Sequence, residues 1–213
     1  MRKLLILDCD GVLYPASNLS HADFICAFNK AREKYKGKRL YVAEENLKNA
    51  ADFWNEIRKM CDISNCSFDD FCKMMIDNIN YKKIRKSRVL LSLLNTTKEK
   101  FDIAVLSDNH YYHLEQILSH RFNLGIKDFS AMGIDCFDIT SSECNGRFFP
   151  KCNEVALSNF LKKQKRKAKD CIFVDNNKSN ISAGRSIGMK SIYICRKRSL
   201  QNYLRQLNGE NYI

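Results

Sequence analysis

The 213-residue chain has little proline and glycine and no long apolar stretch. Two prolines and eight glycines are too few for a collagen-like or low-complexity chain, so we expect a folded protein. No run approaches the roughly 18 apolar residues that a membrane-spanning helix needs. The start MRKLLILDCDG is basic, but its apolar run is short and acidic residues follow at once, which predicts a strand rather than a signal peptide.

Metal-binding and disulfide patterns are also missing, although the chain has ten cysteines. There is no C-x-x-C pair and no Cys/His cluster at the spacing of a zinc site. Cys9, Cys171 and Cys195 lie within apolar runs, where a free thiol packs as a small hydrophobic side chain. We therefore expect reduced cysteines and a cytoplasmic location.

Acidic residues are scarce towards the C-terminus. The formal net charge is +12, and residues 151–213 contain 14 of the 36 Lys and Arg residues but only four acidic ones. The densest run, KKQKRKAK over Lys162–Lys169, could attract a polyanion or form a solvated helix end. We favour the helix end, because no aromatic residues alternate with the charges, and we do not expect nucleic acid or a membrane as partner.

Alternating strands and helices are predicted for most of the chain. Apolar runs predict strands at Leu4–Leu7, Ile103–Leu106, Cys136–Thr140, Cys171–Val174 and Ser191–Cys195. Helical spacing predicts helices at His113–Phe122, Glu154–Lys165 and Ile181–Ile187, the last ending at Gly188. This alternation is typical of an α/β fold with a Rossmann-like parallel sheet.

The stretch 17–86 differs, because it contains helical patterns and no convincing strand. Ser20 and Ser67 are expected N-caps. Apolar stripes at helical spacing comprise Phe24, Ala27, Phe28, Ala31 and Tyr35, then Leu47, Ala50, Trp54, Ile57 and Cys61, then Phe71, Met74, Met75 and Ile79. We predict a core of residues 1–16 and 87–213, with an all-helical insertion over 17–86.

The first predicted strand ends in two carboxylates, Asp8 and Asp10, followed by Gly11. Ligands of open α/β sheets bind where strands end, and glycine lets the backbone turn sharply there. Phosphoryl transfer through a carboxylate needs one acid as nucleophile and a second as proton donor and acceptor. Asp8 and Asp10 can supply both.

Three further polar residues follow the pattern of this chemistry. Ser107 ends the second predicted strand, Lys151 precedes a predicted helix and can reach a phosphate, and Asp175 ends the fourth strand, where it can join Asp8 around Mg²⁺. His110 and His113 lie at an expected helix start and are left out of the catalytic set. Asn109 and Asn176 are candidate polar contacts.

Because these residues occur in this order along the sequence, the chain resembles the haloacid dehalogenase-like (HAD) superfamily of Mg²⁺-dependent phosphohydrolases. The residues that carry the resemblance are the segment DCDGVLY from Asp8 to Tyr14, then Ser107, Lys151, and the Asp175 segment through Asn180, Ala183 and Gly188. The resemblance covers the whole chain, and the insertion is placed where one subgroup carries an alpha-helical cap. Tyr14 makes the segment similar to pyrimidine 5′-nucleotidase-like members.

The resemblance implies a HAD-like core with a mobile cap and an aspartyl-phosphate intermediate. Asp8 would be the nucleophile and a metal ligand, and Asp10 the acid/base, with its backbone carbonyl on the metal. Ser107, Asp108 and Lys151 form the implied phosphate-binding set, and Asp175 completes the Mg²⁺ ligands. Dehalogenases of the superfamily lack the second acid, so Asp10 favours a phosphatase.

Two departures from the family pattern leave alternatives open. Asn176 stands where many members have a second consecutive acid, and Asp108 stands where many have Asn or Gly. We expect a phosphatase for a small phosphomonoester, with nucleotides among the candidates. The alternatives are a phosphomutase of the same superfamily and a non-catalytic HAD-fold protein that binds a polyanion.

Overall fold

A computed structural model describes residues 2–19, 21–34, 49–195 and 199–209. The expected N-cap Ser20 and the stripe residues Tyr35 and Leu47 lie outside these ranges. Among the described residues, no helix has the length and apolar character needed to cross a membrane.

The centre of the molecule is a parallel sheet of five strands, ordered β3-β2-β1-β4-β5. The strands are β1 (Leu4–Asp8), β2 (Asp102–Leu106), β3 (Ile134–Phe137), β4 (Cys171–Asp175) and β5 (Lys190–Tyr193). In register, Asp8 lies opposite Leu106 of β2, and Leu7 lies opposite Val174 of β4. The strand order reverses beside β1, which is where open α/β sheets bind their ligands. The predicted α/β fold is confirmed.

The prediction of a strand over Cys136–Thr140 is wrong in its second half. Strand β3 ends at Phe137, and the short 3-10 helix η4 (Ile139–Ser142) follows. Asp138 explains the turn, because its carboxylate accepts hydrogen bonds from the Tyr111 N–H at 2.9 Å and the Thr140 hydroxyl at 2.6 Å. Strand-like residues such as Ile139 therefore continue in the sequence after Phe137, the last residue of β3 that pairs with β2.

Helices cover both faces of the sheet, and alternate residues of β1 point to opposite layers. Leu5 and Leu7 belong to the larger apolar core, with α4 (Arg88–Thr97), α5 (Tyr111–Phe122) and α9 (Leu200–Asn208). Leu4 and Ile6 pack with α7 (Glu154–Lys163) and α8 (Lys178–Ser186) on the other face. A short helix, α6 (Ile126–Ala131), precedes β3. Burial on both faces explains why the strands read as continuous apolar runs.

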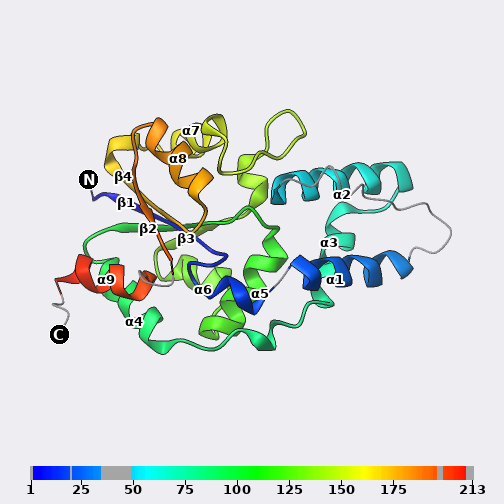
Figure 1. Ribbon diagram of the computed structural model, residues 1–213, viewed down its shortest axis with the longest axis horizontal. Coiled ribbons are helices and arrows are strands. Elements are labelled where there is room, and N and C mark those ends of the chain that lie inside the picture. Colours follow the sequence, from blue (N-terminus) through cyan, green and yellow to red (C-terminus); the bar gives the residue numbers. More distant parts are fainter. Residues whose placement is uncertain (1, 20, 35–48, 196–198, 210–213) are drawn as a thin grey trace.

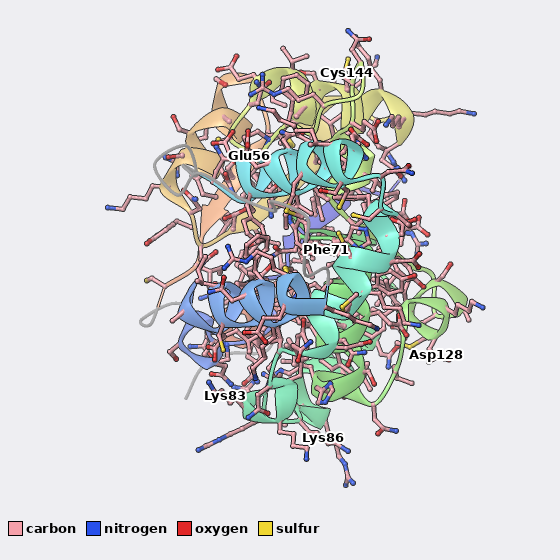
Figure 2. All side chains as sticks on the ribbon, turned by 90° about the vertical axis from the view of Figure 1, so that its right-hand side faces the viewer. Glu56, Phe71, Lys83, Lys86, Asp128 and Cys144 are labelled. Atoms are coloured by element: carbon pink, nitrogen blue, oxygen red, sulfur yellow. The ribbon has the colours of Figure 1, made fainter. Side chains whose placement is uncertain are left out.

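Between β1 and α4, the described residues form three α-helices: α1 (His21–Lys34), α2 (Ala50–Ser64) and α3 (Phe68–Asp77). Ser67 caps α3 by accepting a hydrogen bond from the Asp70 N–H, as expected, and Asn49 caps α2. The three helices stand together beyond the end of β1 (Figure 1). From that side, α1 and α2 lie across the front, with Phe71 of α3 between them (Figure 2).

Their apolar stripes face inward, as predicted. The buried members in the described residues are Ala27, Phe28, Ala31, Trp54, Ile57, Cys61, Phe71, Met75 and Ile79. The helices also contact the core: Asn55 of α2 donates to the Phe148 carbonyl at 2.9 Å and accepts from the Phe148 N–H at 2.8 Å. Arg58 lies 3.9 Å above the Phe148 ring and pairs with Glu143 at 3.1 Å.

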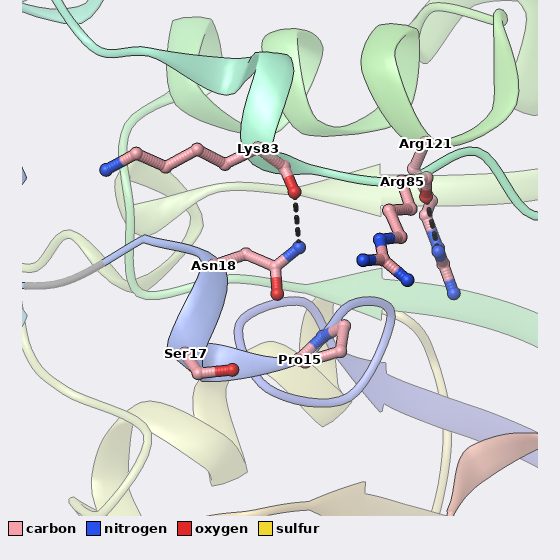
Figure 3. A pocket seen from close by; sticks show the side chains of 6 residues that line it. All are labelled: Pro15, Ser17, Asn18, Lys83, Arg85 and Arg121. Carbon is pink, nitrogen blue, oxygen red and sulfur yellow. Dashed lines mark hydrogen bonds between the residues drawn. The ribbon is translucent and has the colours of Figure 1, made fainter.

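The two segments that join these helices to the core lie side by side. Asn18 donates its side-chain amide to the Lys83 carbonyl at 2.7 Å (Figure 3). Arg121 of α5 donates to the Arg85 carbonyl on one segment and to the Leu13 carbonyl, at 3.0 Å, on the other. A cavity of about 490 Å³ opens between them (Figure 3). The inserted helices are thus held to the core at both ends.

Candidate active site

The carboxyl ends of three neighbouring strands bring together the predicted acids and Ser107. Asp8 ends β1, Ser107 follows β2 and Asp175 ends β4; all three are buried. Gly11 makes the turn after Asp10 with φ +82°, and a Cβ there would lie 2.1 Å from the side chain of Asn176. This close approach is open only to glycine.

Lys151 reaches this edge from the segment before α7. Its ammonium donates to the Asp8 carboxylate and, at 3.0 Å, to the Leu106 carbonyl, and it lies 3.6 Å from Asp175. Burial lowers the pKa of Lys151, but attraction by Asp8, Asp175 and Asp108 outweighs burial and raises it. Lys151 therefore stays charged although only 4% of it is exposed.

One ammonium does not balance the acids around it. Burial raises the pKa of Asp8, Lys151 opposes this rise, and the charges of Asp175 and Asp10 add to it. A further cation at this place would favour the ionised form of Asp8.

Asn176 turns its side chain towards Asp8 and Asp10. With its amide nitrogen facing them, it donates to the Asp10 carbonyl at 2.9 Å and to the second Asp8 carboxylate oxygen at 3.1 Å. In the opposite amide orientation, three oxygens converge, and oxygen is the ligand atom that Mg²⁺ prefers. The donor set therefore fits Mg²⁺, although no cluster of three His, Cys, Asp or Glu side chains at metal-binding distance occurs in the described ranges.

Asp175 has a different set of partners. One of its carboxylate oxygens accepts from the Asn177 N–H at 2.7 Å, and the other accepts from the Asn180 side chain at 2.9 Å. Since the Lys151 ammonium lies 3.6 Å from its carboxylate, Asp175 links the start of α8 to the Lys151 side of the site. Its assignment as a metal ligand stays a prediction.

The predicted phosphate-binding residues take up two kinds of position. Ser107 places its hydroxyl at the strand end, where it accepts from the Asn109 N–H at 3.0 Å. Asp108 instead accepts from the backbone N–H of Lys151, at 3.0 and 3.3 Å. Burial raises the pKa of Asp108 to about 6. The Asp108 carboxylate thus holds the Lys151 segment in place, and its phosphate-binding role remains a prediction.

The Asp10 carboxylate is surrounded by hydrogen-bond donors. Its Oδ1 accepts from the Tyr14 hydroxyl and lies 3.1 Å from His113 Nε2. Its Oδ2 accepts from the Asn109 side chain at 2.9 Å and from the Ser107 hydroxyl at 3.5 Å. Burial raises the pKa of Asp10, but attraction by His113 and the hydrogen bonds outweigh burial and lower it.

The sequence patterns did not identify two residues of this cluster, His113 and Tyr81. His113 was excluded as an ordinary helix-start histidine, yet it contacts Asp10 directly and is fully buried. Tyr81, whose hydroxyl lies 2.6 Å from His113 Nδ1, was not singled out at all. The available signal was the position of His113 next to Leu114 and Ile117 on the buried face of α5; nothing local marked Tyr81.

The inserted helices also approach this edge. Trp54 of α2 packs 5.6 Å from the ring of His110, and Asp69 of α3 lies 3.3 Å from His110 Nε2. Phe24 of α1 packs 5.0 Å from the ring of His113. The helices thus cover the segment between Ser107 and α5.

Solved structures with this fold share most of their length with the chain. The UTR4 protein of Saccharomyces cerevisiae aligns with a TM-score of 0.54 and 14% identity, covering 91% of this chain and 89% of that one. A HAD family enzyme of Bacteroides thetaiotaomicron, in complex with magnesium and inorganic phosphate, gives 0.54 and 16%, covering 91% and 94%. CbbY of Rhodobacter sphaeroides, in complex with phosphate, gives 0.58 and 12%, covering 91% and 86%. At these identities the likeness establishes the fold.

Sequence comparison gives one result at the level of the family. No curated protein matches the chain significantly. The model of the haloacid dehalogenase-like hydrolases matches residues 2–188, which include every residue of the site described above. Because this match spans strands β1 to β4, the acids and the lysine of the site, and most of the chain, the chain belongs to the haloacid dehalogenase-like hydrolase family.

Proposed function

We propose that the protein is a Mg²⁺-dependent phosphatase that hydrolyses a small phosphomonoester through an aspartyl-phosphate intermediate. The observation that carries the proposal is the surroundings of Asp8. One carboxylate oxygen accepts from Lys151, while the other faces the Asn176 side chain, as the Asp10 carbonyl also does. This division provides a cation for the phosphoryl oxygens on one side and an oxygen-lined metal position on the other.

Asp8 would attack the phosphorus atom and form a P–O bond as the bond to the leaving oxygen breaks. Because its pKa is lowered in the free protein, Asp10 would first take up a proton as the substrate binds, and it would give this proton to the leaving oxygen. The resulting carboxylate would then take a proton from the water that attacks the aspartyl phosphate. Lys151 and the Ser107 hydroxyl would hold the phosphoryl oxygens. Asp8, the Asp10 carbonyl and Asn176 would hold Mg²⁺, with Asp175 as the further predicted ligand. When bound, Mg²⁺ supplies the positive charge that offsets repulsion between carboxylate and phosphate.

The inserted helices, 17–86, would act as the cap that excludes water and selects the substrate. The neighbouring structures support a small phosphorylated ligand: one holds magnesium with inorganic phosphate, and a mutant of CbbY holds xylulose 1,5-bisphosphate. Tyr14 and its segment make nucleotides the first group of substrates to test. The ten cysteines are all free, which supports the proposed cytoplasmic location.

The test is phosphate release from a panel of phosphomonoesters, nucleotides included, with Mg²⁺ or with EDTA. We expect Mg²⁺-dependent release by the wild type and loss of release in Asp8→Asn. Asp135→Asn, an exposed aspartate on β3, is the matched control and should keep full activity. Release that persists in Asp8→Asn would contradict the mechanism, and a phosphorylated sugar as product would indicate a phosphomutase.

A further inference from the structure

His113 is a fully buried, polar side chain that the proposed reaction does not use. Its Nε2 lies 3.1 Å from Asp10 Oδ1, and its Nδ1 lies 2.6 Å from the Tyr81 hydroxyl. Since an ionised carboxylate only accepts hydrogen bonds, Nε2 carries a proton and donates to Asp10. Tyr81 donates to Nδ1 when the ring is neutral and accepts from it when the ring is protonated. Both ring nitrogens are therefore occupied.

Two tyrosines connect to Asp10, Tyr14 directly and Tyr81 through His113, and they lie near the two ends of the insertion. Tyr14 lies on the first joining segment, next to Leu13, and Tyr81 begins the short helix η3 (Tyr81–Lys83) in the second. Both are buried. The hydrogen bond from Asn18 to the Lys83 carbonyl fixes the two segments to each other near these residues (Figure 3). Tyr81 and His113 thus connect the second segment with the carboxylate.

The four donors around Asp10 determine the orientation of its carboxylate. Oδ1 is held by Tyr14 and His113, and Oδ2 by Asn109 and Ser107, so rotation about the Cβ–Cγ bond would break bonds on both oxygens. Proton transfer needs this orientation, because the acid must lie within hydrogen-bond reach of the reacting oxygen.

We propose that His113 and Tyr81 are positioning residues for the proton transfers of Asp10: Tyr81 orients the His113 ring, and His113 orients the carboxylate. The inference rests on the proposed function, in which Asp10 is the acid/base. It predicts that removing the Tyr81–His113–Asp10 connection slows the steps that need Asp10 and leaves the attack by Asp8 unchanged.

The substrate p-nitrophenyl phosphate separates these steps, because its leaving group departs without protonation. Formation of the aspartyl phosphate then depends on Asp8, and its hydrolysis depends on Asp10. In stopped flow, we expect His113→Phe to keep the rate of the initial burst of p-nitrophenol and to lower steady-state turnover by about 10- to 100-fold. Tyr81→Phe should lower turnover several-fold, and His113→Gln, which keeps a donor, should restore part of the loss.

Matched controls come from the same region. His120→Gln changes another histidine of α5, whose ring also packs 5.6 Å from Tyr81, and Tyr111→Phe changes a partly exposed tyrosine; both should behave as wild type. In an Asp10→Asn background, His113→Phe and Tyr81→Phe should cause no further loss of turnover.

The outcomes separate this inference from the proposed function. A wild type that releases phosphate, with burst and turnover reduced equally in His113→Phe and Tyr81→Phe, would overturn the positioning role alone. Full additivity with Asp10→Asn would also overturn it. A wild type without any phosphatase activity, on p-nitrophenyl phosphate or on the substrate panel, would overturn the proposed function.

Discussion

Asp8 and Asp10 lie two residues apart on one loop, and their surroundings differ in origin and in effect. Asp8 is held by Lys151 and by strand ends of the core, whereas Asp10 is held by Tyr14, by His113 and, through it, by Tyr81 beside the inserted helices. The pKa is raised at Asp8, where burial prevails, and lowered at Asp10, where attraction by His113 and the hydrogen bonds prevail over burial. The nucleophile thus depends on cations, and the acid/base on oriented donors.

The largest effect is expected when the cation beside Asp8 is removed. Lys151→Met leaves Asp8 and Asp175 buried without their ammonium, so we expect a loss of about 3–5 kcal/mol in the free energy of unfolding, and no phosphate release. Urea denaturation measures the first effect. The exposed Lys169→Met is the control and should stay within about 0.5 kcal/mol of wild type. Equal stability of the two variants would show that Asp8 does not depend on Lys151.

The second prediction concerns Asn176, which lies beside Asp8. Asn176→Asp adds a charge where the Asn176 side chain faces Asp8 and the Asp10 carbonyl, so we expect Mg²⁺ to bind about tenfold more tightly, or about 1.4 kcal/mol. Titration calorimetry with MgCl₂ measures this. Asn177→Asp, whose side chain caps α8, is the control. The same increase in both variants would place the metal elsewhere.

On the Asp10 side, Tyr14→Phe removes one donor and leaves the other three. We expect a loss of about 1–2 kcal/mol in the free energy of unfolding, because a buried carboxylate loses one hydrogen bond. Tyr111→Phe serves as control at a partly exposed position. A neutral effect of Tyr14→Phe in urea denaturation would mean that the remaining donors satisfy Asp10 fully.

The smallest expected effect concerns the pH dependence of stability. The pKa of Asp108 is about 6 in the folded protein, above its ordinary value of 3.8, so the folded state binds more protons between these values. Its contribution to stability is therefore full at low pH and falls as the pH rises from about 4 to about 6. The difference in unfolding free energy between wild type and Asp108→Asn should decrease with pH across this window. A difference independent of pH would contradict the raised pKa.

The sequence predicted the parts of this site that depend on local patterns. Asp8, Ser107 and Asp175 stand at the ends of apolar strands, and parallel pairing places such ends at one edge. Lys151 was predicted from its position just before a helix. The fold class and the helical insertion followed from the same periodicity.

The rest of the site depends on contacts that no local pattern marks. Tyr81 and His113 are 32 residues apart, and His113 and Asp10 are 103 apart, so their contacts arise from packing α5 against the joining segment. From the sequence alone, a histidine that packs in the apolar core cannot be distinguished from one that contacts a buried carboxylate, because both occur among apolar residues of a helix. The partners of Asp108 and Asn176 likewise depend on loop conformations that composition does not fix.

The most direct test of the account is to look for a phosphoryl group on Asp8. Asp10→Asn should slow hydrolysis of the intermediate, so this variant, mixed with p-nitrophenyl phosphate and Mg²⁺ and quenched in acid, is analysed by mass spectrometry of its peptides. We predict one phosphoryl group on the peptide that contains Asp8, and none when Asp8→Asn is added. Phosphate release by the wild type, with no phosphoryl group on Asp8 in the quenched variant, would contradict the central claim.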